Sequence, residues 1–287
     1  MPSLLDIRRR IRSVKNTQQL TKAMKTVSAA KLRRAQERVF SARPYADQLK
    51  KVLGNLTARV EEIEEISHPL LEVRPEERVL FVVVTADRGL CGAFNSNILR
   101  AAVGFLKEHT SQNVTLATAG RKGRDFFRRR GLPIRAEFVN IFSKLDYGNA
   151  RDIAEMITQA YSAKEVDAVH LIYNEFKSVI QQRVVIEKVL PLSRVELKET
   201  EPQLDYIFEE PPQEIFNRLL PRYVEVQIYR ALLESAAAEH GARMASMDTA
   251  SRNAGDMIDM LTLNMNRIRQ AAITREIIEV VSGAGAL

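Results

Sequence analysis

The first fifty residues have the hydrophobic spacing of one long helix. Between Ser3 and Arg43 there is no glycine or proline, and apolar residues recur every three or four positions, which places them on one helix face. These positions are Leu4, Ile7, Ile11, Val14, Leu20, Met24 and Val27. Ser3 is a suitable N-cap, and Asp6 at the third helical position can complete a capping box by accepting a hydrogen bond from the Ser3 backbone N–H. We therefore expect one helix to about Leu56, kinked at Pro44.

The last seventy residues repeat this pattern with heptad spacing. Apolar residues step by four and three positions, as in a two-helix coiled coil. They are Ala254, Ile258, Leu261, Met265, Ile268 and Ala272, continued upstream by Val224, Ile228, Ala231, Ser235, Ala238, Ala242 and Ala245. A helix from about Gln213 to Gly283 would be roughly 105 Å long and needs a partner along its length. The other long helix is at the opposite end of the chain, so we predict an antiparallel coiled coil of the two terminal segments.

Methionine is concentrated in this second helix. Five of the eight methionines lie between Met244 and Met265. The favoured interpretation is a seam filled by methionine side chains. The alternative is a surface that meets several partners in turn, because methionine adapts its shape to different contacts.

The middle of the chain alternates strand and helix patterns. Val79–Val84 is a continuous apolar run, typical of a strand buried on both faces. Further strands are expected at residues 114–118, 168–173 and 182–189, and helices at 95–109, 121–130 and 151–162. This order predicts a mainly parallel, Rossmann-like sheet with right-handed crossovers. We place this α/β domain at residues 75–210, between coiled-coil helices at 1–60 and 211–287.

The excess of positive over negative charge is confined to the first helix. Residues 1–60 contain 15 basic and 3 acidic residues, whereas the net charge of the whole chain is +7. Such a block needs an anionic partner or extensive solvation. Nucleic acid is one candidate, since Arg8–Arg10 suits phosphates, but no aromatic residue precedes Phe40 to stack on bases. A solvated basic face remains an alternative.

Candidate catalytic chemistry lies in the loop after the first strand. This loop contains Asp87, Arg88, Gly89, Cys91 and Gly92, at the end of a strand where α/β proteins bind ligands. It lacks the glycine spacing that holds phosphates, so a rigid structural turn is favoured over a nucleotide or catalytic site. An α/β enzyme with an accessory helical arm remains a rival hypothesis.

Metal, disulfide and membrane chemistry find little support in the sequence. The single cysteine and four scattered histidines have no metal-ligand spacing, so we expect no metal and no cofactor. The basic run Gly120–Arg124 could bind phosphate at a helix start, although a solvated basic face is favoured. No uncharged apolar run approaches the roughly 18 residues of a membrane helix, and the N-terminus lacks the apolar centre of a signal peptide. A soluble protein of a reducing compartment, the bacterial cytoplasm, is expected.

Short motifs along both helices and the central loop occur in the order of one known family. They are Asp6–Arg8, Asn16–Gln18, Thr21–Met24, Arg43–Tyr45, Asp87–Gly92, Leu220–Glu225, Arg269–Ile277 and Val281–Ala284. In these motifs the chain resembles the gamma subunit of F-type ATP synthases. Thr26 and Ser28 depart from the Met and Ala common in the family. The paired-cysteine insertion of plastid members is absent, so no redox switch is expected.

The resemblance implies a central rotor shaft without catalytic residues of its own. Such a shaft turns inside a hexamer of three alpha and three beta subunits, and couples proton flow through the membrane c-ring to ATP synthesis or hydrolysis. It also takes part in regulating ATPase activity and proton flow. The implied partners are the alpha, beta and epsilon subunits and the c-ring, with one copy per complex, no homo-oligomer and no nucleic acid. The implied location is peripheral, on the cytoplasmic face of the bacterial cell membrane.

The resemblance also assigns roles to particular positions. A catch that binds a beta-subunit loop is expected at Arg269, Gln270, Thr274 and Glu276, with Met24 on the opposing helix at the same level. Contacts to an acidic beta-subunit loop, inferred from charge, are expected at Lys22, Lys25, Lys31, Arg33 and Arg34. An apolar bearing tip is expected at Ile277, Ile278, Val280 and Val281, where continuation of the coiled-coil seam is the alternative. A foot that meets the c-ring and epsilon is expected at Asp205, Tyr206 and Glu209.

Overall fold

The computed structural model describes residues 3–60, 68–179, 181–192 and 211–284. The chain forms two compact units, and each of the two long helices contributes to both. The helical unit is Met1–Ala29 with Arg243–Leu287, and the sheet unit is Ala30–Ala242. The boundaries predicted from sequence follow the ends of elements, whereas these units divide both long helices.

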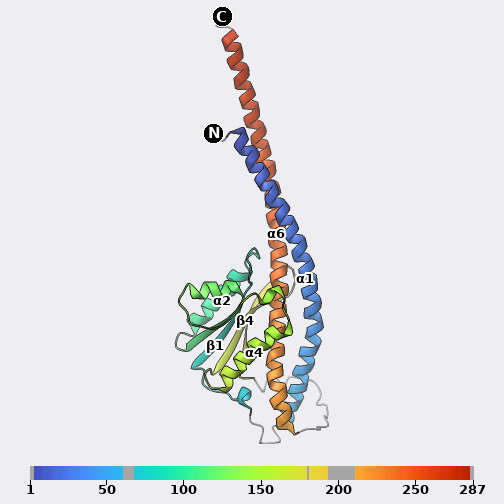
Figure 1. The fold of residues 1–287 in the computed structure, drawn as a ribbon, viewed down its shortest axis with the longest axis vertical. Helices are drawn as coiled ribbons and strands as arrows, with labels where there is room; N and C mark the ends of the chain where they lie inside the picture. The colour runs from blue at the N-terminus through green and yellow to red at the C-terminus, as the bar shows by residue number, and fades with distance from the viewer. Residues whose placement is uncertain (1–2, 61–67, 180, 193–210, 285–287) are drawn as a thin grey trace. The chain divides into compact units, whose positions relative to one another are not determined.

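Two helices longer than any other element begin and end the described chain. They are α1 (Leu4–Val60) and α6 (Pro212–Ala284) (Figure 1). The N-cap prediction for α1 is confirmed, because the Asp6 backbone N–H donates to Ser3 Oγ (3.2 Å) and the Ser3 backbone N–H donates to Asp6 Oδ2 (3.2 Å). Pro44 lies inside α1, as expected. None of the described helices contains a stretch long and apolar enough to span a membrane.

In the helical unit, α1 and α6 run antiparallel (Figure 1). Gln18 Nε2 donates to the Ser251 carbonyl oxygen (3.2 Å), and Thr21 Oγ1 lies 2.7 Å from Ser251 Oγ. Further along α1, Lys25 Nζ lies 2.6 Å from Asp248 Oδ1. Residue numbers thus rise on one helix as they fall on the other, which is the predicted antiparallel pairing.

The inward face of α1 is partly polar, which corrects the predicted apolar stripe. Leu20 and Val27 were expected at the seam, but their exposed fractions are 65% and 56%. Gln18 and Thr21 face α6 instead, and Ser28 is buried. Gln18 and Thr21 continue the heptad spacing from Val14, and their side chains form hydrogen bonds with Ser251 and with the α1 backbone. The heptad spacing therefore determines which face of α1 packs against α6. Polar residues are tolerated on that face because their side chains form hydrogen bonds.

The heptad positions of α6 from Ala254 to Ile268 face α1 as predicted, whereas Ala272 lies beyond the start of α1. Ala254 is buried, and the other predicted seam residues are partly covered. Only part of the methionine cluster belongs to this seam. Met247 is buried (4% exposed), whereas Met257 and Met260 are 47% and 65% exposed. Both interpretations of the methionine cluster therefore apply in part, because one methionine fills the seam and others form an exposed surface.

The sheet unit contains a five-stranded sheet in the order β3-β2-β1-β4-β5. Its strands are β1 (Arg78–Val84), β2 (Asn113–Ala119), β3 (Ile134–Phe138), β4 (Ala168–Phe176) and β5 (Gln182–Leu190). Neighbouring strands are parallel except the antiparallel β4-β5 pair. The four strands expected from sequence are confirmed. The short edge strand β3 was missed because its apolar residues alternate with Arg135 and Glu137 instead of forming a continuous run.

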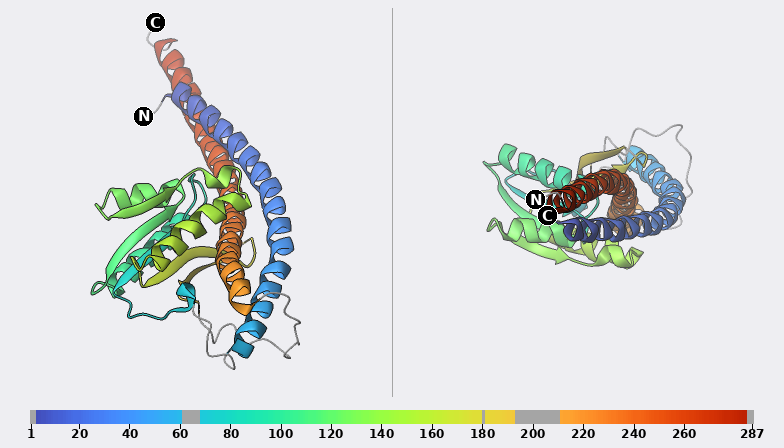
Figure 2. Two further views of the ribbon diagram at one scale, coloured as in Figure 1. Left: turned by 60° about the horizontal axis from the view of Figure 1, so that its bottom comes forward. Right: turned by 90° about the horizontal axis from the view of Figure 1, so that it is seen from above.

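Besides the long helices, the described residues of the sheet unit form three helices and two short 3-10 turns. The helices are α2 (Phe94–Glu108), α3 (Arg121–Arg128) and α4 (Tyr147–Ser162), and the turns are η1 (Pro69–Leu71) and η2 (Ile141–Ser143). Helices α2 and α4 cover opposite faces of the sheet (Figure 2). Helix α4 begins four residues earlier than predicted, because Asp146 and Asn149 form a capping box.

A buried carboxylate joins both long helices to the sheet. Glu234 on α6 has a 3% exposed side chain. It accepts hydrogen bonds from Arg43 Nε (3.1 Å) and Nη2 (2.8 Å) on α1, and from the Phe176 backbone N–H (3.1 Å) at the end of β4. The predicted small residues of α6 are buried beside it, including Ala231, Ser235 and Ala238. They allow close packing at this level.

Candidate partner-binding surfaces

The loop after β1 is tied down by hydrogen bonds within the chain. Asp87 Oδ1 accepts from the backbone N–H groups of Arg121 (3.0 Å) and Asn140 (2.9 Å). Asn95 Oδ1 accepts from the Ala86 backbone N–H (2.9 Å), and Asn95 Nδ2 donates to Cys91 Sγ (3.2 Å). Cys91 is 1% exposed. This geometry supports the rigid structural turn.

The same loop explains why Gly120–Arg124 is a poor phosphate site. A helix N-terminus attracts anions through its unpaired backbone N–H groups. At the start of α3, the Asp87 carboxylate already accepts from the Arg121 N–H, and Thr85 Oγ1 accepts from the Gly123 N–H (2.8 Å). Protein side chains thus occupy the position that a phosphate would take.

Two histidines that are far apart in sequence, His109 at the end of α2 and His170 on β4, lie near each other. The ring centroids of His109 and His170 lie 6.2 Å apart, with Phe105 stacked on His109 at 3.8 Å. Burial lowers the pKa of His170, although Glu76 at 3.7 Å opposes this shift. Among the described residues no group of three or more His, Cys, Asp and Glu is placed to hold a metal ion. The cluster is a packed aromatic group beside an exposed ion pair of Lys188 and Glu76.

The buried histidines predict acid sensitivity of the fold. Burial lowers the folded-state pKa of both His68 and His170 below 6.5, so the unfolded chain binds protons more readily. Stability is therefore complete above about pH 6.5 and is lost as the pH falls through the folded-state pKa values. We expect the urea midpoint to fall between pH 7 and pH 5.5, and the His68→Gln/His170→Gln double variant to show a flatter profile. An equal slope in both proteins would contradict this account.

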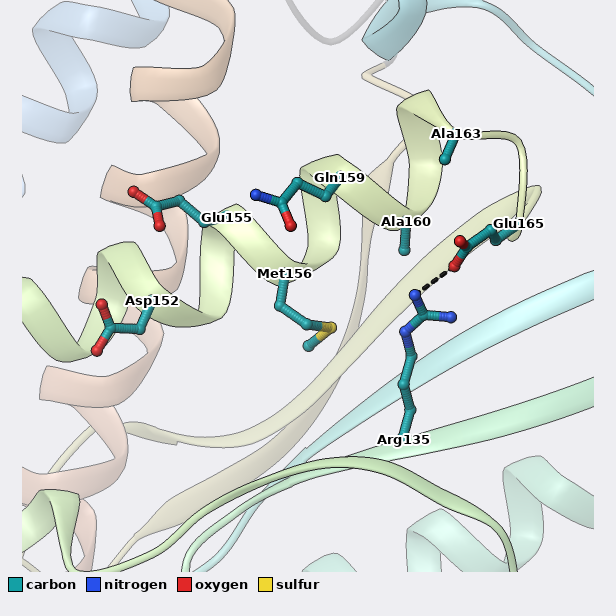
Figure 3. A pocket seen from close by; sticks show the side chains of 8 residues that line it. All are labelled: Arg135, Asp152, Glu155, Met156, Gln159, Ala160, Ala163 and Glu165. Carbon is teal, nitrogen blue, oxygen red and sulfur yellow. Dashed lines mark hydrogen bonds and ion pairs between the residues drawn. The ribbon is translucent and has the colours of Figure 1, made fainter.

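A shallow hollow lies between the edge strand β3 and α4 (Figure 3). Its volume is about 360 Å³, and it is lined by Asp152, Glu155 and Gln159 of α4 together with Arg135 and Glu165. The Arg135 guanidinium is paired with the Glu165 carboxylate across its mouth. Among the described lining residues, Arg135 is the one cation and this ion pair uses it, so no cation is left to act together with Asp152 or Glu155.

The structure separates Met24 from the rest of the predicted catch. Arg269, Gln270, Thr274 and Glu276 lie exposed within two turns of α6. Met24 was expected opposite them, but its neighbour Lys25 pairs with Asp248. That level is 21 residues before Arg269, or roughly 30 Å along the helix. The placement of Met24 at the catch was therefore wrong, because the antiparallel register pairs the start of α1, not its middle, with the region near Arg269.

The predicted apolar tip is exposed on a single helix. Since Gln18 lies opposite Ser251, α1 begins opposite the residues just before Arg269, and α6 continues past it (Figure 1). The exposed fractions of the four tip residues are 57%, 59%, 71% and 65% for Ile277, Ile278, Val280 and Val281. Within the helical unit, α1 does not reach these residues. Continuation of the two-helix seam does not account for them.

The predicted basic contacts are exposed, and some already have acidic neighbours. In the helical unit, Lys22 is exposed and Lys25 pairs with Asp248. In the sheet unit, Lys31 and Arg34 are exposed and Arg33 pairs with Glu37 at 3.2 Å. These pairs are solvent-exposed and therefore weak, so they leave the cations available to a partner. The predicted foot, Asp205, Tyr206 and Glu209, lies outside the described residues.

The structure combines two antiparallel terminal helices with a sheet whose first loop is held by hydrogen bonds, and it exposes apolar and basic surfaces. These features are typical of a structural subunit of a larger assembly. The profile of a family described as ATP synthase matches residues 3–287. The ATP synthase gamma chain of Solibacter usitatus is 56% identical over 100% of this chain and 99% of its own length. That of Pelotomaculum thermopropionicum is 51% identical over the full length of both. The chain belongs to the ATP synthase gamma chain family, a non-catalytic stalk subunit, as the sequence motifs predicted.

Solved structures agree with this assignment. A chain from the central stalk and c-ring structure of Tetrahymena thermophila mitochondrial ATP synthase has a TM-score of 0.65 and 28% identity. The similarity covers 81% of this chain and 99% of that one. A chain of the Euglena gracilis mitochondrial ATP synthase has a TM-score of 0.69 with 19% identity, covering 99% of this chain and 94% of its own. The second similarity concerns the fold alone, and it confirms terminal helices around a mainly parallel sheet.

Proposed function

We propose that this chain is the central rotor shaft of a bacterial F-type ATP synthase. In this role it turns within a hexamer of alpha and beta subunits and couples proton flow through the c-ring to ATP synthesis or hydrolysis. The observation that carries the proposal is the exposed apolar end of α6, which extends past its helical partner, in a chain 56% identical to a gamma chain. An apolar surface of this kind needs a protein environment around it.

Such a shaft would act by shifting the conformational populations of the subunits that surround it. Rotation changes catalysis only if the shaft binds one conformation of the surrounding subunits better than the others. The two helices meet this need because their surfaces differ. The α1 side of the helical unit carries Lys22 and Lys25, whereas α6 exposes Met257 and Met260. Each orientation would therefore present different chemistry to a given beta subunit.

The basic residues of α1 are proposed to meet an acidic loop of the beta subunits. They are Lys22, Lys25, Lys31, Arg33 and Arg34. Long-range attraction suits a moving contact, since it does not require one rigid docking geometry. Their exposed positions and weak internal pairs support this role.

The ends of the shaft are proposed to contact different partners. The apolar tip from Ile277 to Val281 would turn inside an apolar sleeve of the hexamer. The foot, Asp205, Tyr206 and Glu209, would meet epsilon and the c-ring. The complex would hold this chain at the cytoplasmic face of the bacterial cell membrane as a peripheral subunit, and the rigid sheet unit would transmit torque.

The catch predicts a turnover defect without an assembly defect. Replacing both Arg269 and Gln270 with alanine removes charged and amide hydrogen-bond donors from an exposed turn. We expect the ATPase rate of the assembled complex to fall about tenfold, as for the loss of one or two hydrogen bonds with a charged group. The matched control is Arg275→Ala, an exposed arginine on the same helix that lies at least about 120° around the helix axis from both Arg269 and Gln270. A rate equal to that of the control would count against the catch.

Co-purification tests the proposed function as a whole. The tagged full chain should recover alpha, beta and epsilon subunits when it is co-expressed with them. Removal of residues 277–287, which include the apolar tip, should lower the rate of ATP hydrolysis by the recovered complex. Recovery of nucleic acid instead, with a steep salt dependence, would favour the nucleic-acid hypothesis, and recovery of no subunit would reject the proposal.

A further inference from the structure

A cavity of about 560 Å³ lies in the sheet unit between α1, the start of α4 and α6. Six of its lining residues are either tyrosine or arginine. They are Arg38, Tyr45, Tyr147, Arg222, Tyr229 and Arg230. Its volume lies within the range of about 300–1,000 Å³ typical of small-molecule sites. Its residues come from three segments far apart in sequence, so no local motif indicated it.

The tyrosines form a fixed aromatic wall. The rings of Tyr147 and Tyr229 meet edge to face, with centroids 5.3 Å apart and an interplanar angle of 69°. The Tyr147 hydroxyl donates to a Glu225 carboxylate oxygen, which also pairs with Arg222 Nη1 at 3.0 Å. Tyr45 contributes a third ring, 54% exposed, from α1. These contacts hold the rings of Tyr147 and Tyr229 in place, and both residues remain partly exposed.

Two arginines converge on one short turn at the mouth. Arg38 Nη1 donates to the Leu145 carbonyl oxygen (3.2 Å), and the Arg222 guanidinium lies over the Tyr147 ring at 4.5 Å. The carbonyl is neutral, so it leaves the charge of Arg38 uncompensated, and the Arg222 side chain is 46% exposed. Asp146 is the one acidic residue among the described lining residues, and its Oδ1 caps α4 through the Asn149 N–H. The lining thus contains three arginines and one acid, and Glu225 beside it pairs with Arg222.

We propose that this cavity binds a nucleoside phosphate. The base would pack against Tyr147 and Tyr229, since every base offers a face for stacking. The phosphates would accept hydrogen bonds from Arg38 and Arg222, whose planar guanidinium groups suit phosphate oxygens. A simple inorganic anion would leave the aromatic wall unused, and an apolar molecule would leave the arginines unused. This site is separate from the rotor surfaces and does not depend on the proposed function.

Calorimetric titration of the purified full chain tests the proposal with ADP, adenosine and pyrophosphate at fixed ionic strength. We expect one ADP per chain, bound about tenfold or more tightly than either fragment, because only ADP contacts both the rings and the arginines. Pyrophosphate that binds as tightly as ADP would show a merely basic surface and overturn the proposal. Adenosine that binds as tightly as ADP, or no ADP binding at millimolar concentration, would also overturn it.

Variants locate the binding. Arg38→Gln is expected to weaken ADP binding about tenfold, and Ala42→Glu, which adds an anion to the lining, is expected to abolish it. The control is Arg100→Gln, which removes the same charge from an exposed position on α2 outside the cavity. Melting temperatures measured without ligand identify any variant that fails to fold, in which case Arg222→Lys serves as the replacement. Equal ADP affinity in the folded cavity variants and the control would contradict the assignment.

Discussion

Gly120→Ala is expected to lower the free energy of unfolding of the sheet unit by roughly 4 kcal/mol, by combining backbone strain with a steric clash. Gly120 has a φ of +105°, a region that side-chain-bearing residues rarely adopt. A Cβ atom there would lie 2.0 Å from the Thr85 carbonyl oxygen and 2.7 Å from its carbon. Both atoms belong to backbone at the end of β1, so neither yields easily.

The measurement is urea unfolding followed by tyrosine fluorescence. All seven tyrosines lie between Tyr45 and Tyr229, and the chain has no tryptophan, so the signal reports the sheet unit alone. The matched control is Gly131→Ala, because Gly131 also has a positive φ of +67° but no atom within 4 Å of the added Cβ. We expect the control to cost about 1–2 kcal/mol. Equal losses of unfolding free energy in the two variants would show that the clash with Thr85 does not exist.

Glu234→Leu is the second change with a large expected effect, about 3 kcal/mol. It removes the buried acceptor of Arg43 and of the Phe176 backbone N–H, and leaves that N–H without a partner in the interior. Arg43→Leu should cost a similar amount for the opposite reason, because it leaves the Glu234 carboxylate buried without its cation.

A double-mutant cycle separates this pair from ordinary packing. If the two side chains act as a pair, the Arg43→Leu/Glu234→Leu protein should lose less stability than the two single variants combined, by about 1–3 kcal/mol. Urea unfolding of all four proteins gives this coupling energy directly. Additive losses would mean that the carboxylate is stabilised by the sheet and not by α1.

The long helices and central strands were predictable because their signals are repeated many times. The heptad steps of α6 and the continuous apolar run of β1 each rest on several residues. Strand β3 was not predictable in the same way, since its five residues alternate and its neighbours decide its pairing. The polar seam positions Gln18 and Thr21 were missed because their partner, Ser251, is more than two hundred residues away.

The candidate sites were predictable only where they are local. The exposed tip at Ile277–Val281 follows from apolar residues on one helix. The level of Met24 depends on the antiparallel register, which no single segment determines. The cavity lined by Tyr147 and Arg222 is formed by three segments that are far apart in sequence. Asp87 likewise accepts hydrogen bonds from two distant residues, Arg121 and Asn140. Sequence spacing contains no direct signal for such contacts.

Rotation of the chain inside its complex tests the central proposal most directly. Cys91 is 1% exposed, so Arg151→Cys on the exposed surface of α4 provides an accessible thiol for a bead. The labelled chain would be assembled with alpha and beta subunits fixed to a surface and supplied with ATP. A rotor shaft predicts continuous bead rotation in one direction. ATP hydrolysis by the assembled complex with a stationary bead would contradict it.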